Sequence, residues 1–277
     1  MRHYRFAAVF PFDSALHIIG LILAFVIGLS LGLLGSGGSA ITVPVLVYCM
    51  GISVTQSISE SVFVVGITSF CGGIYNLIQN RVAWSPLLWL GIPSVISAFI
   101  TKWFIVPTLP AEISIFQIQM SKDSYLMLLF AVLLLLISRG MIRPKKIASV
   151  ENSTTKFFPA VITGLVVGCL IGLLGIGGGF LIVPVLVLYF HLDMKIAVGT
   201  SLWLIAFNCL VSIVSDSSGS VFDWNFLFLY TGLTILGMVI SWSLSKRISS
   251  EKIKVIAGYV ILLTGIFVIA ERIFGNH

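Results

Sequence analysis

Two stretches of the sequence are near copies of each other: GLLGSGGSAITVPVLV at residues 32–47 and GLLGIGGGFLIVPVLV at residues 172–187. Each stretch places a cluster of glycines, and then a proline, inside a long apolar segment. Relative to alanine, glycine costs roughly 1 kcal/mol and proline roughly 3 kcal/mol in the interior of a helix. Two such breaks at matching positions indicate that the interruption of the helix serves a purpose.

The similarity extends beyond the glycines and predicts an internal duplication. Without gaps, residues 28–84 overlay residues 168–224 with 14 identities in 57 positions, at a constant offset of 140. The identical pairs include Pro44 with Pro184, Ser61 with Ser201, and Trp84 with Trp224. We therefore expect two transmembrane repeats, residues 1–142 and 157–277, joined by a basic cytoplasmic linker at residues 143–156.

The composition excludes a water-soluble domain. Of the 277 residues, 58% are hydrophobic and only 9% are charged, and the mean hydropathy is +1.12. Soluble proteins carry about 25% charged residues. The apolar runs are continuous and do not alternate with period two, which favours helices over a β-barrel. The sequence therefore predicts an all-α polytopic bundle in membrane lipid, and the net charge of +6 reports on loop orientation and not on nucleic-acid binding.

Each half is expected to contain four long spans and one short one. The predicted segments are 15–34, 41–50, 57–78, 85–106 and 124–142, and then 157–174, 181–190, 197–214, 224–244 and 254–274. The segments at 41–50 and 181–190 are too short to cross a bilayer, which needs about 20 apolar residues.

Lysine and arginine in the loops predict the orientation, because they concentrate on the cytoplasmic side. If every segment counts as one pass, the halves have opposite topology, and 11 of the 16 Lys and Arg fall inside and five outside. If each broken pair makes one crossing, the repeats are parallel. We prefer the inverted arrangement, which is common in secondary transporters.

The glycine breaks are predicted to lie in the bundle interior, because lipid cannot satisfy free backbone N–H and C=O groups. A helix is expected to restart after each break with Pro44 or Pro184 in its first turn, and Ser39 or Thr42 could cap the first one. A helix N-terminus presents free N–H groups and a partial positive charge. Two of them, one per repeat, would form a site for a small anion near the bilayer midplane.

Helix packing is the alternative use of these glycines. For Gly28, Gly32, Gly168 and Gly172, which form small-xxx-small patterns, packing is the better interpretation. A cluster that breaks the helix needs another explanation, and there we favour a binding site. The candidate residues are Gly35, Ser36, Gly37, Gly38 and Ser39 in the first half, and Gly175, Gly177, Gly178 and Gly179 in the second.

The doubled GxGGGxxxVP pattern resembles the sulfite exporter TauE/SafE family over nearly the whole chain. The resemblance is strongest at the second copy and the following AVGTSL, whereas the first copy has Ser36, Ser39 and SISESV at these places. It implies a permease, by its name an exporter, for sulfite, sulfonates or related organic anions in a bacterial inner membrane. It implies anion transport more firmly than any one substrate.

Polar residues within the spans are further candidates, since buried polar groups in lipid are often functional. Ser61, Thr200, Ser201 and Asn208 could line the same cavity or could form interhelical hydrogen bonds. Glu60 is a candidate for proton coupling, although a solvated place at the membrane boundary is the slightly preferred alternative. Tryptophans near the span ends, such as Trp84 and Trp224, are attributed to the interfacial belt.

A secondary transporter is therefore the favoured function, and an anion channel or a non-transporting membrane partner protein is the alternative. The sequence has no GxxxxGK[ST] or HExxH motif and no buried Ser, His and Asp set, so we expect neither an enzyme nor a cofactor. Its four cysteines lack metal-ligand spacing, so no metal site is predicted. The coupling ion, the direction of flux and a homo-oligomeric state are left open.

Overall fold

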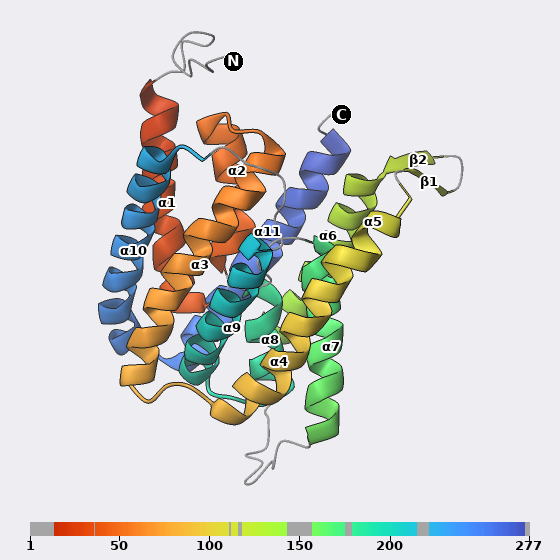
Figure 1. Cartoon of the computed structure of the whole chain (residues 1–277). Coiled ribbons are helices and arrows are strands. Elements are labelled where there is room, and N and C mark those ends of the chain that lie inside the picture. Colours follow the sequence, from red (N-terminus) through yellow and green to blue (C-terminus); the bar gives the residue numbers. More distant parts are fainter. Residues whose placement is uncertain are drawn as a thin grey trace.

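The chain is a bundle of helices with one added β-hairpin (Figure 1). The computed structural model describes residues 14–35, 37–110, 112–115, 118–142, 157–174, 179–214 and 222–274. The elements of the first half are α1 (Ser14–Leu34), α2 (Gly37–Met50), α3 (Val54–Ile78), α4 (Trp84–Ile100), the π-helical turn η1 (Thr101–Ile105), α5 (Val106–Thr108), β1 (Glu112–Ile115), β2 (Ile118–Ser121) and α6 (Lys122–Ile142). Those of the second half are α7 (Phe157–Leu174), α8 (Gly179–Leu188), α9 (Met194–Val214), α10 (Trp224–Arg247) and α11 (Ser250–Phe274).

The predicted all-α membrane bundle is confirmed, and each predicted segment corresponds to a helix. Within the described residues, five helices are long and apolar enough to cross a bilayer: Leu16–Leu34, Gln56–Ile78, Trp84–Thr108, Met194–Val214 and Trp224–Arg247. The antiparallel hairpin of β1 and β2, in which Glu112 lies opposite Ser121, was not predicted.

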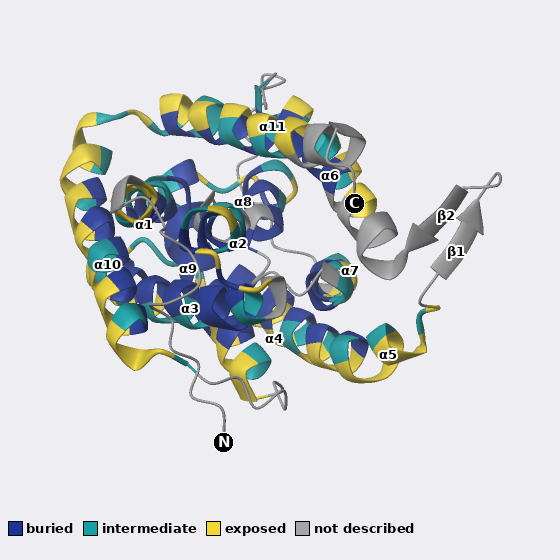
Figure 2. Cartoon of the chain, turned by 90° about the horizontal axis from the view of Figure 1, so that it is seen from above, coloured by how far each residue is buried: buried dark blue, intermediate teal, exposed yellow. Residues whose placement is uncertain are grey.

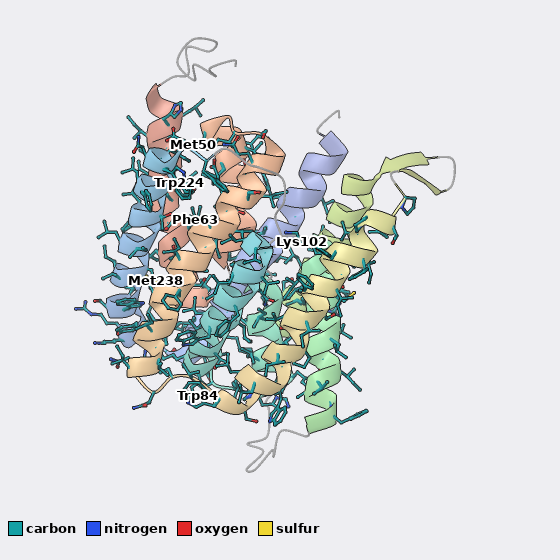
Figure 3. The ribbon with its side chains drawn as sticks, viewed as in Figure 1. Met50, Phe63, Trp84, Lys102, Trp224 and Met238 are labelled. Atoms are coloured by element: carbon teal, nitrogen blue, oxygen red, sulfur yellow. The ribbon has the colours of Figure 1, made fainter. Side chains whose placement is uncertain are left out.

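Corresponding helices of the two halves run in opposite directions. In Figure 1, α1 begins at the top of the bundle, where α11 ends, whereas α7 begins at the bottom. Trp84 and Trp224, which the offset of 140 pairs, accordingly lie near opposite ends of the bundle (Figure 3). Both side chains are more than half exposed, as an interfacial position requires. The duplication itself stays a prediction of the sequence, and these directions are the ones that an inverted pair needs.

The two short helices occupy the interior. Seen from above, α2 and α8 lie within a ring formed by the longer helices (Figure 2). Four aliphatic side chains of α8, those of Ile182, Val183, Leu186 and Leu181, are at most 2% exposed. At about 1.5 Å per residue, the 14 residues of α2 and the 10 of α8 span about 21 and 15 Å, roughly half to two thirds of the hydrocarbon core.

Helices of one half pack against helices of the other half at glycines: α1 packs along α10, and α4 packs along α7. A side chain at Gly28 would collide with the backbone carbonyl of Thr234, and one at Gly168 with that of Ser94. These contacts correspond to each other under the offset of 140. A further pair follows the same rule: Gly32 lies against Ser241, and Gly172 lies against Thr101. The packing interpretation of these four glycines is confirmed.

The predicted first-turn position of the two prolines is wrong. Helix α8 begins at Gly179, where the restart was expected, and α2 begins at Gly37, two residues before the expected Ser39. Pro44 and Pro184 therefore lie beyond the first turn, and Ser39 and Thr42 are helical residues and not N-caps. Because proline has no N–H, the carbonyls four residues earlier receive no helical hydrogen bond from these positions.

The α1–α10 contact allows a matched test on one helix. Gly237 of α10 lies against the backbone of Phe25, whereas Gly232 of the same helix has nothing within 4 Å of where a Cβ would be. We expect Gly237→Ala to lower the free energy of unfolding by about 1–3 kcal/mol through overpacking. Gly232→Ala should raise it by up to about 1 kcal/mol through helix propensity. Thermal unfolding of both variants in detergent measures the difference, and equal effects would contradict the close contact.

Candidate functional site

The first break is a sharp turn at a single glycine. Gly35 ends α1 with a φ of +66°, in the left-handed region that favours glycine, and its N–H donates to the carbonyl of Leu31 at 2.8 Å. The next helix begins two residues later, at Gly37. The chain therefore reverses direction within the bundle with almost no free loop.

The second half holds this turn in place. The Ser201 hydroxyl of α9 shares its hydrogen between the carbonyls of Gly35 at 3.2 Å and Val198 at 2.9 Å. A Cβ on Gly35 would lie 2.7 Å from the Ser201 oxygen and 3.0 Å from Cα of Val198. Two predicted site residues from different halves, Gly35 and Ser201, are thus in direct contact.

Much of the predicted site cannot be placed. Ser36, Gly175, Gly177 and Gly178 lie outside the described residues, and nothing is described of the side chain of Ser39. Gly37 and Gly38 form the first turn of α2, and Gly179 begins α8 and is buried. The two short helices contact each other in the interior of the bundle.

Of the other polar candidates, two are engaged in local structure. The Thr200 hydroxyl donates to the carbonyl of Ile196 and accepts from the N–H of Ala83, which precedes α4. It therefore fixes the start of α4. Ser61, buried in α3, donates to the carbonyl of Ile58 at 2.8 Å.

Glu60 and Asn208 have unsatisfied polar atoms. Glu60 is 1% exposed, so the interpretation that it is solvated at the membrane boundary is wrong: the helices around α3 cover it. Its Oε1 accepts from Nε2 of Gln56 at 2.8 Å, and its Oε2 has no partner. Asn208 is 2% exposed, and neither its Nδ2 nor its Oδ1 is hydrogen-bonded.

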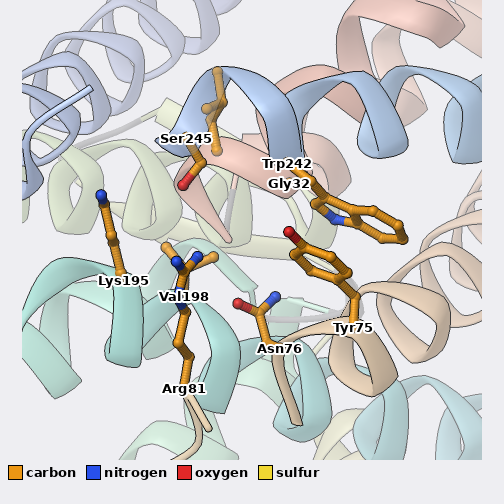
Figure 4. A pocket seen from close by; sticks show the side chains of 9 residues that line it. Gly32, Tyr75, Asn76, Arg81, Lys195, Val198, Trp242 and Ser245 are labelled. Carbon is orange, nitrogen blue, oxygen red and sulfur yellow. The ribbon is translucent and has the colours of Figure 1, made fainter. Parts of the chain in front are cut away.

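A basic cavity that the sequence did not reveal lies at the end of the bundle where α3 meets α4 (Figure 4). Arg81 and Lys195 extend side by side into it, and Tyr75 stacks on Trp242 with ring centroids 3.8 Å apart. We name it the Arg81 cavity; it is lined by Gly32, Leu33, Tyr75, Asn76, Arg81, Lys195, Val198, Trp242 and Ser245. Arg81 lies in the connection between α3 and α4, and Lys195 lies in the first turn of α9, so only the fold brings these distant cations together.

A second small cavity contains Lys102 and Asn208. We name it the Lys102 cavity; it is lined by Ala98, Phe99, Lys102, Ile171, Gly172, Asn208, Val211 and Ser212. The two cavities are related by the offset of 140, because Gly32 corresponds to Gly172 and Trp242 to Lys102. Each has a volume of about 10 Å³, room for roughly one water molecule.

A third cavity, the largest of the three, has a different character. It has a volume of about 390 Å³ and is lined mainly by apolar side chains of α1, α2 and α11, among them Leu23, Pro44 and Phe267. Among the described residues none that lines it is charged, so it does not fit a small anion. The polar cavities next to Gly32 and Gly172 are therefore the better candidates for a path to the breaks.

Comparison with known proteins decides the class. The model of the family described as "Sulfite exporter TauE/SafE" matches residues 20–268. The chain belongs to this family. Similar proteins include a "Probable membrane transporter protein" of Xylella fastidiosa, 26% identical over 88% of this chain and 91% of that protein. The "Probable membrane transporter protein YunE" of Bacillus subtilis is 27% identical over 93% and 98%.

A third relative comes from an archaeon. The protein of Methanocaldococcus jannaschii, also named a "Probable membrane transporter protein", is 23% identical over 90% of this chain and 94% of its own length. No solved structure matches the chain significantly. With the family and the apolar helices, these relatives show that the TauE/SafE chain is an integral, multi-pass membrane transporter and not an enzyme.

The Gly35 turn yields a prediction about transport. Gly35→Ala combines a strained positive φ with a collision at Ser201, so we expect the turn to shift and flux to fall by roughly tenfold or more. Gly51→Ala is the control, because Gly51 has a φ of +67° in the exposed connection between α2 and α3. It shares the backbone strain and should retain most of the flux. Similar losses in both variants would show that strain alone is responsible.

Proposed function

We propose that this TauE/SafE transporter is a secondary exporter of small sulfur-containing or organic anions, such as sulfite and sulfonates, in the inner membrane of a bacterium. The anion binds at the starts of α2 and α8, where the two halves meet. The observation that carries the proposal is the contact between Gly35 and Ser201, which joins the break of one half to the long helix α9 of the other.

The electrostatics of the described residues support an anionic substrate. Helices α2 and α8 lie within the ring of longer helices, and their starts bear the partial positive charge of helix N-termini. The polar cavities carry Arg81, Lys195 and Lys102, and no carboxylate lines either of them. An anion approaching the breaks through these cavities would therefore meet positive charge on its way.

The geometry supports alternating access more than a channel. A channel needs a continuous polar path, whereas the two cavities have room for about one water molecule each. The opposite directions of α1 and α7 are those of inverted repeats, which are a common basis of alternating access in secondary transporters. The alternatives, an anion channel or a non-transporting partner protein, have no such observation in their favour.

The decisive experiment is flux through the purified protein in proteoliposomes. We expect saturable movement of radiolabelled sulfite or thiosulfate, which Gly178→Leu should abolish while leaving membrane insertion intact, because leucine would block backbone approach at the second break. Non-saturating flux would indicate a channel. If sulfite, thiosulfate, sulfonates and carboxylates all fail to move, the transport proposal for these anions is wrong.

Glu60 is proposed to carry the coupled proton, because it is a buried carboxylate with one free oxygen. We expect Glu60→Gln to lose the response of flux to an imposed pH gradient while keeping anion exchange. The amide preserves the shape and a polar contact with Gln56 but cannot titrate. Flux that still follows the pH gradient in Glu60→Gln would exclude this role. The hydrogen bond from Gln56 to Glu60 supplies a control variant. Gln56→Met removes this bond but keeps the carboxyl group, so it should change the response of flux to the pH gradient less than Glu60→Gln does.

A further inference from the structure

Among the buried residues that the structure describes, Asn208 is the one whose side chain has two polar atoms without a hydrogen-bond partner. It is 2% exposed, and both atoms of its amide lack a hydrogen-bond partner. A buried group without a partner costs about 1–3 kcal/mol, and leucine would fill the same space without that cost. No hydrogen bond in the described structure offsets this cost, whereas a ligand bound beside Asn208 would supply the missing bonds.

The corresponding position in the first half shows what a purely structural solution looks like. The offset of 140 pairs Asn208 with Thr68, whose hydroxyl bonds to the carbonyl of Val64 at 2.7 Å and lies 3.0 Å from Oγ1 of Thr234. Thr234 corresponds to Ser94, and Ser94 donates to its own helix, to the carbonyl of Gly91. The polar side chain at this position, Thr68, is therefore hydrogen-bonded in the first half, whereas the amide of Asn208 in the second half has no partner.

A cation shares the cavity with this amide. Lys102 comes from the π-helical turn η1, where the N–H of Val106 reaches back five residues to the carbonyl of Thr101. Its Nζ donates to the carbonyl of Ser212 near the end of α9 at 3.3 Å. That bond occupies one of the three donors of the ammonium group, and two remain. Of the described residues that line the cavity, Lys102 is the charged one.

We propose that the Lys102 cavity is an oxyanion-binding station, in which Lys102 and the amide of Asn208 bind a monovalent oxyanion that retains a hydroxyl group, such as hydrogensulfite. One cation matches one negative charge. The hydroxyl group of the anion accepts from Nδ2 of Asn208 and donates to its Oδ1, so a single oxygen satisfies both unpartnered atoms. Calling the ligand the transported substrate rests on the function proposed above.

The position and size of the cavity define how the anion is held. Gly172 lines it and precedes Gly175, the start of the second break, by three residues. An anion that reaches the second break through this cavity passes Lys102. With a volume of about 10 Å³, the cavity admits one oxygen atom and not a whole anion. The rest of the anion lies at the mouth of the cavity.

Equilibrium binding to the purified full-length protein tests the station without requiring flux. The probe is sodium hydrogensulfite at mildly acidic pH, and the readout is its concentration-dependent increase in Tm, with sodium chloride at equal ionic strength as the reference. We expect Lys102→Gln and Asn208→Leu each to raise the apparent Kd by roughly tenfold or more, since each removes hydrogen bonds to a charged ligand. Lys102→Arg should retain most of the affinity.

Two controls separate binding from folding. Thr68→Val removes the polar group at the corresponding place in the first half, and Lys252→Gln removes an exposed charge; neither should change the apparent Kd. Without ligand, Asn208→Leu should have a higher Tm than the wild type, because it removes an unpartnered amide. A variant that is more stable and yet binds less cannot be explained by misfolding.

The outcomes are distinct. No hydrogensulfite-dependent change in the wild-type Tm, or unchanged affinity in both Lys102→Gln and Asn208→Leu, overturns the station. Methanesulfonate, a monovalent anion without a hydroxyl, should bind more weakly than hydrogensulfite to the wild type, and equal affinity overturns the hydroxyl contact. Binding that depends on Lys102 and Asn208 without any flux in proteoliposomes would keep the station and reject the transport proposal.

Discussion

A broken helix inside a membrane must find protein partners for its backbone, because lipid offers none. In this transporter, the turn at Gly35 is held by a hydroxyl from the other half, that of Ser201. The break of one half is thus completed by the other half, and α9 cannot move relative to α1 without disturbing this contact. That dependence makes the interior a natural place for a change of conformation that a bound anion could control.

Close backbone contact is the second constraint. Apolar side chains give little preference for one helix over another in lipid, so small residues decide which helices approach closely. Gly28 lets α1 lie directly against α10, and Gly168 lets α7 lie directly against α4, so each helix packs against one from the opposite half. The interior helices α2 and α8 are then enclosed by pairs that join the halves, and not by one half alone.

The sequence was sufficient for the features that repeat along it. The span boundaries follow from continuous hydrophobicity, and the packing role of Gly28 and Gly168 follows from their spacing. The position of Pro44 does not follow from the sequence, because proline is best tolerated in the first turn of a helix, whereas α2 begins seven residues earlier, at Gly37. The hairpin at Glu112–Ser121 has no strong signal in so short a stretch. Arg81 and Lys195 line one cavity, and Lys102 and Asn208 line another, although they come from distant segments. No local sequence pattern predicts which segments meet in this way. The burial of Glu60 likewise depends on neighbouring helices and not on its own position near the start of α3.

The packing of α1 against a helix of the second half has a consequence for the synthesis of the protein. The helix that packs along α1 is α10, and it leaves the ribosome only after some two hundred further residues have been made, with α1 already in the membrane. Until then, the Gly28 surface of α1 faces lipid or other proteins, and the first half has no complete core of its own. Neither half is therefore an independent folding unit, and assembly must wait for the last quarter of the chain.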